Sequence, residues 1–188
     1  MTGQWKTLIK WLARYFHAYG GMRGAVASPF FGFAIIVTGL SYASWLKPEP
    51  DWIVKIESLI PSLLGFSLGT YAILFSIIGS RLKGALRQIK APHGVSYLES
   101  INATFFHFIF VQVVALIWAF LFQGSWLVDL VKLLKPYYPP IEQVGIWAFR
   151  CGSFIGFFLL VYSVLLTIAA ALAVYRLALI RDPMEEKQ

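Results

Sequence analysis

Residues 58–80 read SLIPSLLGFSLGTYAILFSIIGS, a run of 23 residues without a charged side chain. At 1.5 Å per residue, a helix of this length crosses a hydrocarbon core of about 30 Å. Small side chains recur in this run at alternating intervals of four and three residues; this small-residue ladder consists of Ser58, Ser62, Gly65, Gly69, Ala72, Ser76 and Gly79. The spacing places them on one stripe of a helix, where a second helix can approach closely. We therefore predict a transmembrane helix whose ladder is a helix–helix contact.

Three further apolar runs predict an all-α membrane protein with four transmembrane helices, at about 28–46, 58–80, 103–123 and 151–175. The composition agrees, because 59% of the 188 residues are hydrophobic and 13% are charged, about half the charged share of a soluble domain. We divide the chain into an N-terminal amphipathic interfacial helix at 1–27 and a four-helix transmembrane domain at 28–188. A basic cytoplasmic hairpin at 81–100 joins the second span to the third.

The positively charged residues predict the orientation of the spans. Eleven Lys and Arg fall on the side that carries both termini and the 81–100 hairpin, and five fall on the other side. By the positive-inside rule, both termini lie in the cytoplasm. Acidic residues balance the five outer cations, so the whole net charge of +7 faces the anionic inner leaflet. We expect a multi-pass protein of the bacterial inner (cytoplasmic) membrane.

The N-terminal stretch GQWKTLIKWLARYFHAYGG, residues 3–21, predicts a helix that lies on the inner leaflet. Its apolar face is Trp5, Leu8, Ile9, Leu12, Tyr15, Phe16 and Tyr19. Another face carries Lys6, Lys10 and Arg14, which we predict to bind lipid headgroups or a partner. Gly20-Gly21 ends the helical pattern. The alternative is a helix docked on a cytosolic partner.

The loop after the second span predicts a basic helical hairpin. Its cations are Arg81, Lys83, Arg87 and Lys90. The apolar spacing of RLKGALRQIK, residues 81–90, continues the second helix to about Lys90. Pro92-His93-Gly94 breaks that helix, and Ser96 and Glu99 form a capping box that starts the next one. We predict that this hairpin contacts lipid or a cytosolic protein; the alternative is a solvated positive-inside loop.

On the outer side, the sequence predicts a short helix and the start of the last span. SWLVDLVKLLK, residues 125–135, has an apolar face that is typical of a short interfacial helix and consists of Leu127, Leu130, Val131 and Leu134. The last helix starts near Ile141 and runs to Arg181, and Pro183 stops it. At about 40 residues, this helix is longer than a membrane requires.

Few residues within the spans carry chemistry. His107, Gln112 and Gln123 are the polar candidates of the third span, and such residues either bond neighbouring helices or line an ion path. The four predicted spans contain no Asp, Glu or Lys, which argues against a proton-coupled transporter. Cys151 is the single cysteine. We therefore expect no metal site, no cofactor and no catalytic residue, and we classify the protein as a non-enzyme.

Two stretches, PSLLGFSLGTYAILFSIIGS (61–80) and FFHFIFVQVVALIWAF (105–120), resemble segments of small four-span membrane proteins of bacteria. The architecture is also similar to that of the membrane component of the Kiwa anti-phage system. The resemblance covers about half of the chain and identifies no functional residue. It implies a role in defence or sensing beside a soluble DNA-acting partner.

Three functions are compatible with these patterns. The first is a homo-oligomeric inner-membrane sensor or scaffold that recruits a cytosolic partner and, by the resemblance, acts in anti-phage defence; a tetramer is the oligomer we expect. The second is an oligomeric ion channel or membrane-permeabilising effector lined by ladder residues. The third is a small-solute transporter. As partners we expect the anionic lipid bilayer, further copies of the chain and a cytosolic protein, and no direct binding of nucleic acid.

Overall fold

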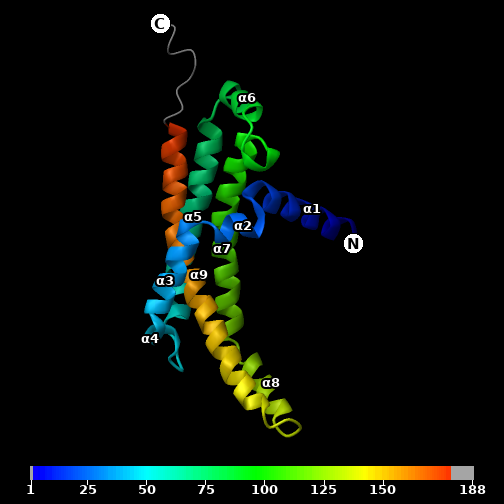
Figure 1. Ribbon diagram of the computed structural model, residues 1–188, viewed down its shortest axis with the longest axis vertical. Coiled ribbons are helices and arrows are strands. Elements are labelled where there is room, and N and C mark those ends of the chain that lie inside the picture. The colour runs from blue at the N-terminus through cyan, green and yellow to red at the C-terminus, as the bar shows by residue number, and fades with distance from the viewer. Residues whose placement is uncertain (1, 179–188) are drawn as a thin grey trace.

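The computed structural model describes residues 2–178, and its named elements are all helices (Figure 1). In chain order they are α1 (Thr2–Tyr19), α2 (Gly21–Val26), α3 (Pro29–Leu40), α4 (Tyr42–Trp45), α5 (Trp52–Ile77), α6 (Ser80–Gln88), the 3-10 turn η1 (Pro92–Gly94), α7 (Tyr97–Gln123), α8 (Trp126–Leu134) and α9 (Ile141–Ala178). The long helices α5, α7 and α9 lie side by side, and α3 packs on α9. This arrangement confirms the predicted all-α class.

Three helices are long and apolar enough to cross a membrane: Trp52–Ser76, Tyr97–Gln123 and Ile141–Arg176. The start of α7 confirms half of the predicted capping box, because the Ser96 hydroxyl oxygen accepts a hydrogen bond from the Glu99 amide at 3.2 Å. The Glu99 carboxylate bonds to Arg14 of α1. The last helix begins at Ile141 as predicted. Its predicted end at Arg181 lies outside the described residues.

The first predicted span, 28–46, is not one continuous helix. Helix α3 has 12 residues, and a break at Ser41 separates it from the four-residue α4. After the break the indole Nε1 of Trp45 donates to the carbonyl oxygen of Thr38 at 2.8 Å, which satisfies one of the free carbonyls at the end of α3. Helix α3 alone covers about 18 Å, less than a hydrocarbon core of about 30 Å.

The prediction that the second helix continues to Lys90 is wrong. Helix α5 ends at Ile77, the next two residues are extended, and α6 starts as a separate helix at Ser80. The break folds α6 over the start of α7, so that Leu86 packs with Ile78 and Leu98 in a small buried cluster (Figure 1). A straight helix would carry Leu86 away from Leu98, and burial of this apolar surface favours the break.

Two apolar clusters fill the interior of the three-helix core. The first surrounds Phe105, Phe108 and Leu166, and the second surrounds Trp52 and Ile56 near the opposite end. Gly156 of α9 allows the Trp52 ring to approach, because a Cβ at Gly156 would collide with that ring. The Trp52 indole also donates to the Ser153 hydroxyl at 2.8 Å, so a bonded aromatic side chain locks α5 against α9.

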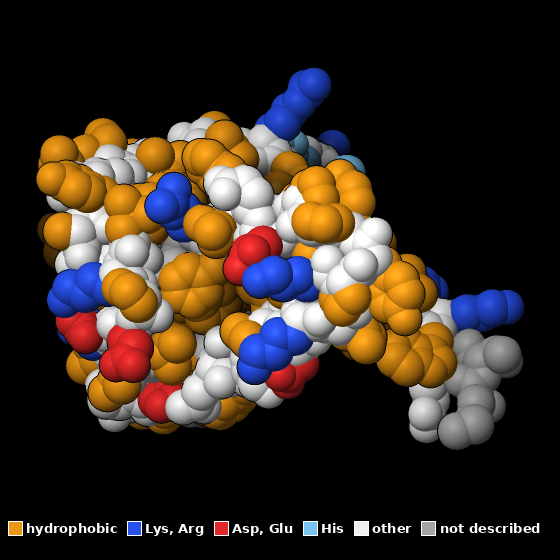
Figure 2. All heavy atoms as spheres, turned by 90° about the horizontal axis from the view of Figure 1, so that it is seen from below, with side chains coloured by type: hydrophobic (Ala, Val, Ile, Leu, Met, Phe, Trp, Pro, Cys, Tyr) orange, Lys and Arg blue, Asp and Glu red, His pale blue; other side chains and the backbone are white. Residues whose placement is uncertain are grey.

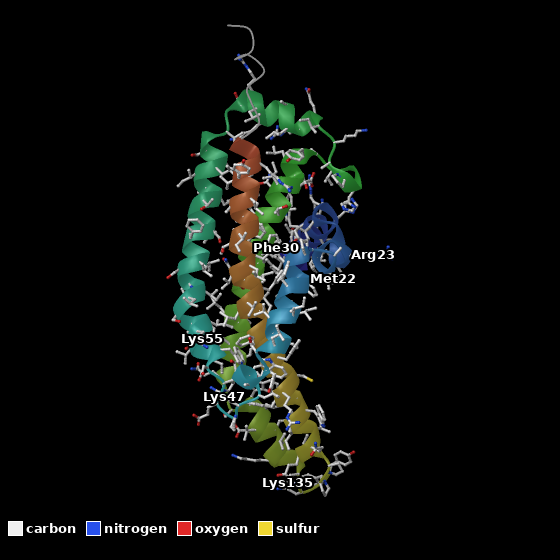
Figure 3. The ribbon with its side chains drawn as sticks, turned by 60° about the vertical axis from the view of Figure 1, so that its left-hand side comes forward. Met22, Arg23, Phe30, Lys47, Lys55 and Lys135 are labelled. Atoms are coloured by element: carbon white, nitrogen blue, oxygen red, sulfur yellow. The ribbon has the colours of Figure 1, made fainter. Side chains whose placement is uncertain are left out.

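The two ends of the molecule differ in charge. Figure 2 views the lower end of Figure 1 and shows acidic and basic side chains side by side among apolar ones. Two ion pairs there join Lys47 to Asp51 and Lys135 to Glu142. Figure 3 places Lys47 and Lys135 toward this end, whereas Arg23 lies on α2, well away from it.

Candidate functional site

Helix α1 is anchored to the bundle through its second half. Tyr15 and Ala18 are buried against Ala103 of α7. In the first half, the side chains of Trp5 and Ile9 are 67% and 63% exposed. Figure 1 shows α1 leaving the bundle sideways, about halfway along the long axis. The helix therefore has one docked end and one end whose apolar side chains are free.

His107 of α7 is the centre of the anchor. The hydroxyl of Tyr15 lies 2.5 Å from Nδ1 of His107, and the hydroxyl of Tyr162 on α9 lies 3.0 Å from Nε2. The ring of Tyr19 stacks on the imidazole at a centroid distance of 4.0 Å. A neutral imidazole has one donor and one acceptor nitrogen, and two hydroxyls satisfy both. His107 thus joins α1, α7 and α9, in agreement with the hydrogen-bonding interpretation of this residue.

Burial raises the pKa of the Tyr15 hydroxyl well above its ordinary value, so the hydroxyl keeps its proton at neutral pH. A protonated hydroxyl can either donate to Nδ1 or accept from it. The contact with His107 is therefore a hydrogen bond between neutral groups rather than an ion pair. It does not depend on salt in the way that surface charge contacts do.

An ion pair lies one helical turn before the buried contact of Ala18 with Ala103. Nε of Arg14 lies 2.6 Å from Oε1 of Glu99, and the guanidinium carbon lies 5.5 Å from the centroid of the Trp11 ring. Hydrogen bonding to Glu99 raises the pKa of Arg14, which stays charged. The two side chains are 58% and 27% exposed, so water screens the pair and its contribution to stability is small.

A cavity of about 650 Å³ lies between α1, α6 and α7. Its apolar wall includes Leu8 and Leu12 of α1 and Phe106 of α7. Its polar side chains include Arg14, Arg87, Glu99, Asn102 and Tyr71. The volume lies within the range of about 300–1,000 Å³ that is typical of small-molecule sites. The cavity is therefore amphipathic, with an apolar body and a cationic edge.

Asn102 fixes one wall of this cavity. Its amide oxygen accepts a hydrogen bond from the Tyr71 hydroxyl at 3.0 Å, and its amide nitrogen donates to the carbonyl oxygen of Leu98 at 3.0 Å. These two bonds hold Asn102 in one orientation and connect α5 with α7. The wall is thus built before any ligand binds, which reduces the ordering cost of binding.

The seven predicted basic residues do not all meet. Arg14 and Arg87 line the same cavity, which brings the N-terminal helix and the hairpin together. Lys6 and Lys10 are exposed on α1, Arg81 and Lys90 are exposed on the hairpin, and Lys83 is half-buried. Within residues 2–178, Arg14 forms an ion pair and Arg87 forms none. Arg87 is thus an available cation at the edge of the cavity.

The other two polar residues of the third span lie elsewhere. Gln112 is fully buried, and its amide nitrogen donates to the Ser67 hydroxyl at 3.2 Å. Its amide oxygen has no hydrogen-bond partner in the part of the chain that the structure describes. Gln123 is exposed at the end of α7. His107, Gln112 and Gln123 therefore do not share one site, and Gln112 contributes a bond between α5 and α7.

The small-residue ladder is exposed in the single chain. All seven of its residues face outward, and a Cβ at Gly65 or Gly69 would meet no atom of the described chain within 4 Å. Gly79 lies outside α5, in the link to α6. The core-facing side of α5 consists of larger residues such as Trp52, Ile56 and Ile60. The ladder is therefore not an intramolecular contact, and its role as a helix–helix contact requires another molecule.

Sequence reasoning missed most partners of His107 and the wall of the cavity. Tyr162 and Tyr71 each lie in an apolar helix and bond to a polar side chain of α7. The residue type alone could have indicated these contacts, because a buried tyrosine hydroxyl requires a hydrogen-bond partner. Across residues 2–178, no three His, Cys, Asp or Glu side chains come together as a metal site, and Cys151 is exposed.

Comparison of the chain with protein-family models, curated proteins and solved structures gives no match.

Proposed function

We propose that this protein is a homo-oligomeric inner-membrane sensor or scaffold. In this proposal α1 lies in the inner leaflet and responds to a change in that leaflet, such as its tension. The hairpin, which α6 and the start of α7 form, recruits a cytosolic partner. The observation that supports this proposal most strongly is the division of α1 into a docked half and a free apolar half. A helix built in this way can change its angle to the bundle without unfolding it.

The height at which α1 docks supports a position in the inner leaflet. Helix α1 packs on α7 at Ala103, and α7 ends at Gln123. Twenty residues of helix cover about 30 Å, the thickness of a hydrocarbon core. If the end of α7 marks the outer boundary of the core, α1 lies at the inner boundary. The ends of α5 and α9 and the whole of α6 then project into the cytoplasm (Figure 1).

The tryptophans support the same two boundaries. Trp5 and Trp11 belong to α1, and Trp45, Trp52, Trp118, Trp126 and Trp147 belong to the lower half of the bundle. Tryptophan is enriched at both interfaces of a bilayer. Mixed charges at the lower end and the basic hairpin at the upper end are consistent with the positive-inside rule.

We propose that α3 and α4 together complete a fourth crossing. Residues 29–45 cover about 25 Å as helix, and a small local thinning of the bilayer accommodates the difference. The hydroxyl of Ser153 donates to the Trp45 carbonyl oxygen and accepts from the Trp52 indole, so both tryptophans lie at one level. Four crossings place both termini in the cytoplasm.

The exposed ladder supports self-association. Lipid chains cannot fill a stripe of small side chains as well as another helix can, and close backbone approach replaces the missing hydrophobic drive. Symmetric closure into a small ring such as a tetramer covers the ladder in every copy. On the resemblance to the Kiwa membrane component, we further propose that the stimulus accompanies phage attack.

Charge reversal tests the recruitment of a partner. We expect Arg87→Glu with Lys90→Glu to abolish co-purification of a cytosolic partner from the native host, with insertion and assembly unchanged. Lys6→Glu with Lys10→Glu is the matched pair on α1, and we expect it to loosen α1 from anionic vesicles instead. Undiminished co-purification of the partner with the Arg87/Lys90 variant would contradict recruitment by the hairpin.

The exposure of Ser62, Gly65, Gly69 and Ser76 favours one second candidate, an oligomeric channel or permeabilising effector. In a ring of copies, these small and partly polar residues could line a narrow path. Overexpression of a constitutive channel depolarises cells, whereas overexpression of a sensor without its partner leaves the membrane potential unchanged. A potential-sensitive dye distinguishes the two.

A further inference from the structure

We propose that the cavity between α1, α6 and α7 binds one anionic phospholipid of the inner leaflet. In this arrangement the phosphate lies at Arg87, and an acyl chain lies along the apolar wall. The inference rests on the proposed function in one respect, namely that α1 lies at the inner leaflet. It adds a specific ligand, because membrane contact of α1 alone requires no cavity.

The charge of the cavity selects an anion. Two guanidinium groups, Arg14 and Arg87, and one carboxylate, Glu99, line it, which leaves an excess of one positive charge. Glu99 is paired with Arg14 at 2.6 Å. Arg87, without an ion pair in the described chain, is therefore free to receive a phosphate. The planar guanidinium group can bind two phosphate oxygens at once.

The apolar wall selects an acyl chain rather than a small soluble anion. Leu12 of α1 and Leu98 and Phe106 of α7 line the cavity together with Ala103. A soluble phosphate compound would leave this surface uncovered. An acyl chain covers it, and each buried methylene group contributes about 0.8 kcal/mol. The combination of a phosphate site and an apolar wall therefore fits a phospholipid.

The cavity is open to the leaflet along α1. Leu8 and Trp11 line the cavity, and both side chains are more than half exposed. They continue into the free apolar face that Trp5 and Ile9 form. A lipid can thus enter sideways from the bilayer, and its bound chain would contact both α1 and α7. Lipid occupancy in this position would stabilise the docked state of α1.

The test uses the full chain purified in a neutral detergent. Phosphatidylglycerol is titrated, and retained lipid is measured by native mass spectrometry. Phosphatidylcholine with the same acyl chains, inorganic phosphate and glycerol phosphate are the comparison ligands. The variants are Arg87→Gln, with Arg81→Gln as the matched control on the same helix, and Leu8→Glu, with Ala13→Glu as the control on another face of α1. The two control residues do not line the cavity, and all four side chains are exposed, so we expect the variants to fold.

We expect phosphatidylglycerol to bind at least tenfold more tightly than phosphatidylcholine, and the two soluble phosphates not to compete. Loss of one charged hydrogen-bonding group weakens binding about tenfold, so Arg87→Gln should raise Kd by that factor. Leu8→Glu should weaken binding at least as much, and the controls should stay within about twofold. Equal affinity for both lipids, full competition by inorganic phosphate, or equal effects of Arg87→Gln and Arg81→Gln would overturn the proposal.

Failure of this proposal is distinguishable from failure of the proposed function. Arg81→Glu with Lys90→Glu leaves Arg87 intact and tests partner recruitment separately. Loss of recruitment in that variant with unchanged lipid affinity supports two separate roles. A protein that recruits its partner and yet retains no phosphatidylglycerol refutes the lipid site alone.

Discussion

The hydroxyl of Tyr15 lies 2.5 Å from Nδ1 of His107, although the two residues are 92 positions apart in the chain. This hydrogen bond connects the N-terminal helix to the buried face of α7, and the Tyr162 hydroxyl occupies the other ring nitrogen. His107 is therefore shared between α1 and the three-helix bundle. In the proposed function, a side chain in that position connects the docking of α1 to α9.

Removal of the Tyr15 hydroxyl should undock α1. Tyr15→Phe leaves Nδ1 of the buried His107 without a partner, at a cost of about 1–2 kcal/mol, so the docked population should fall roughly tenfold. A cysteine pair at Ala18 and Ala103, tested in a Cys151→Ser background, reports docking by disulfide formation. Tyr42→Phe, on an exposed tyrosine, is the control. Unchanged cross-linking in Tyr15→Phe would show that the hydrogen bond does not hold α1.

Exchange of the two charges should identify the role of the Arg14–Glu99 pair. Arg14→Glu alone places two negative charges side by side, and Glu99→Arg alone places two positive charges side by side. Each single variant should lower Ala18–Ala103 cross-linking, and the double exchange should restore most of it. Because the pair is largely exposed, the coupling between the two residues should be weak and should decrease further in 1 M salt. Absence of rescue by the double variant would exclude a direct pair.

Two glycines should respond in opposite ways. Gly69→Leu adds a side chain where no described atom of the chain lies within 4 Å, so we expect normal folding and loss of oligomers in mild detergent. Gly156→Ala collides with the Trp52 ring and should cost about 1–3 kcal/mol of stability without a specific effect on assembly. Thermal unfolding and size-exclusion chromatography with light scattering separate the two effects. Unchanged oligomers in Gly69→Leu would show that the ladder faces lipid.

Cysteine accessibility should establish the number of crossings. In a Cys151→Ser background, we expect Glu49→Cys and Asp129→Cys to react with an impermeant reagent from outside, and His93→Cys to react only after permeabilisation. Gly3→Cys distinguishes four crossings from three, because a three-crossing chain would expose it outside. Reaction of His93→Cys from outside would overturn the whole orientation.

The sequence allowed the all-α class, the start of α7 and the start of α9 to be predicted, because these depend on local signals. An apolar run and the Ser96 N-cap act over a few residues. The end of α5 could not be predicted in this way. The break at Ile78 depends on the contact of Leu86 with Leu98, which forms only after α6 folds back. Tertiary burial there overrides the local helical pattern.

The candidate site was predicted only in part for the same reason. His107 was identified as a residue of the third span, but its partners come from α1 and α9. Arg14 and Arg87 were both expected on a basic surface, but their meeting at one cavity depends on how α1 and α6 fold back onto α7. The periodicity of a single helix carries no information on such contacts between distant segments.

In the proposed function, α1 moves relative to the hairpin while the bundle stays fixed, and membrane tension is the stimulus tried. The most direct measurement is the distance distribution between spin labels at Gln4 of α1 and Gln88 of α6, in vesicles that are relaxed or osmotically swollen. A pair at Leu59 and Val113, on exposed faces of α5 and α7 and outside the ladder, is the control. We predict that swelling shifts the 4–88 distribution, that Tyr15→Phe shifts it without swelling, and that the 59–113 distribution stays constant. A 4–88 distribution that is identical in relaxed and swollen vesicles would contradict movement of α1.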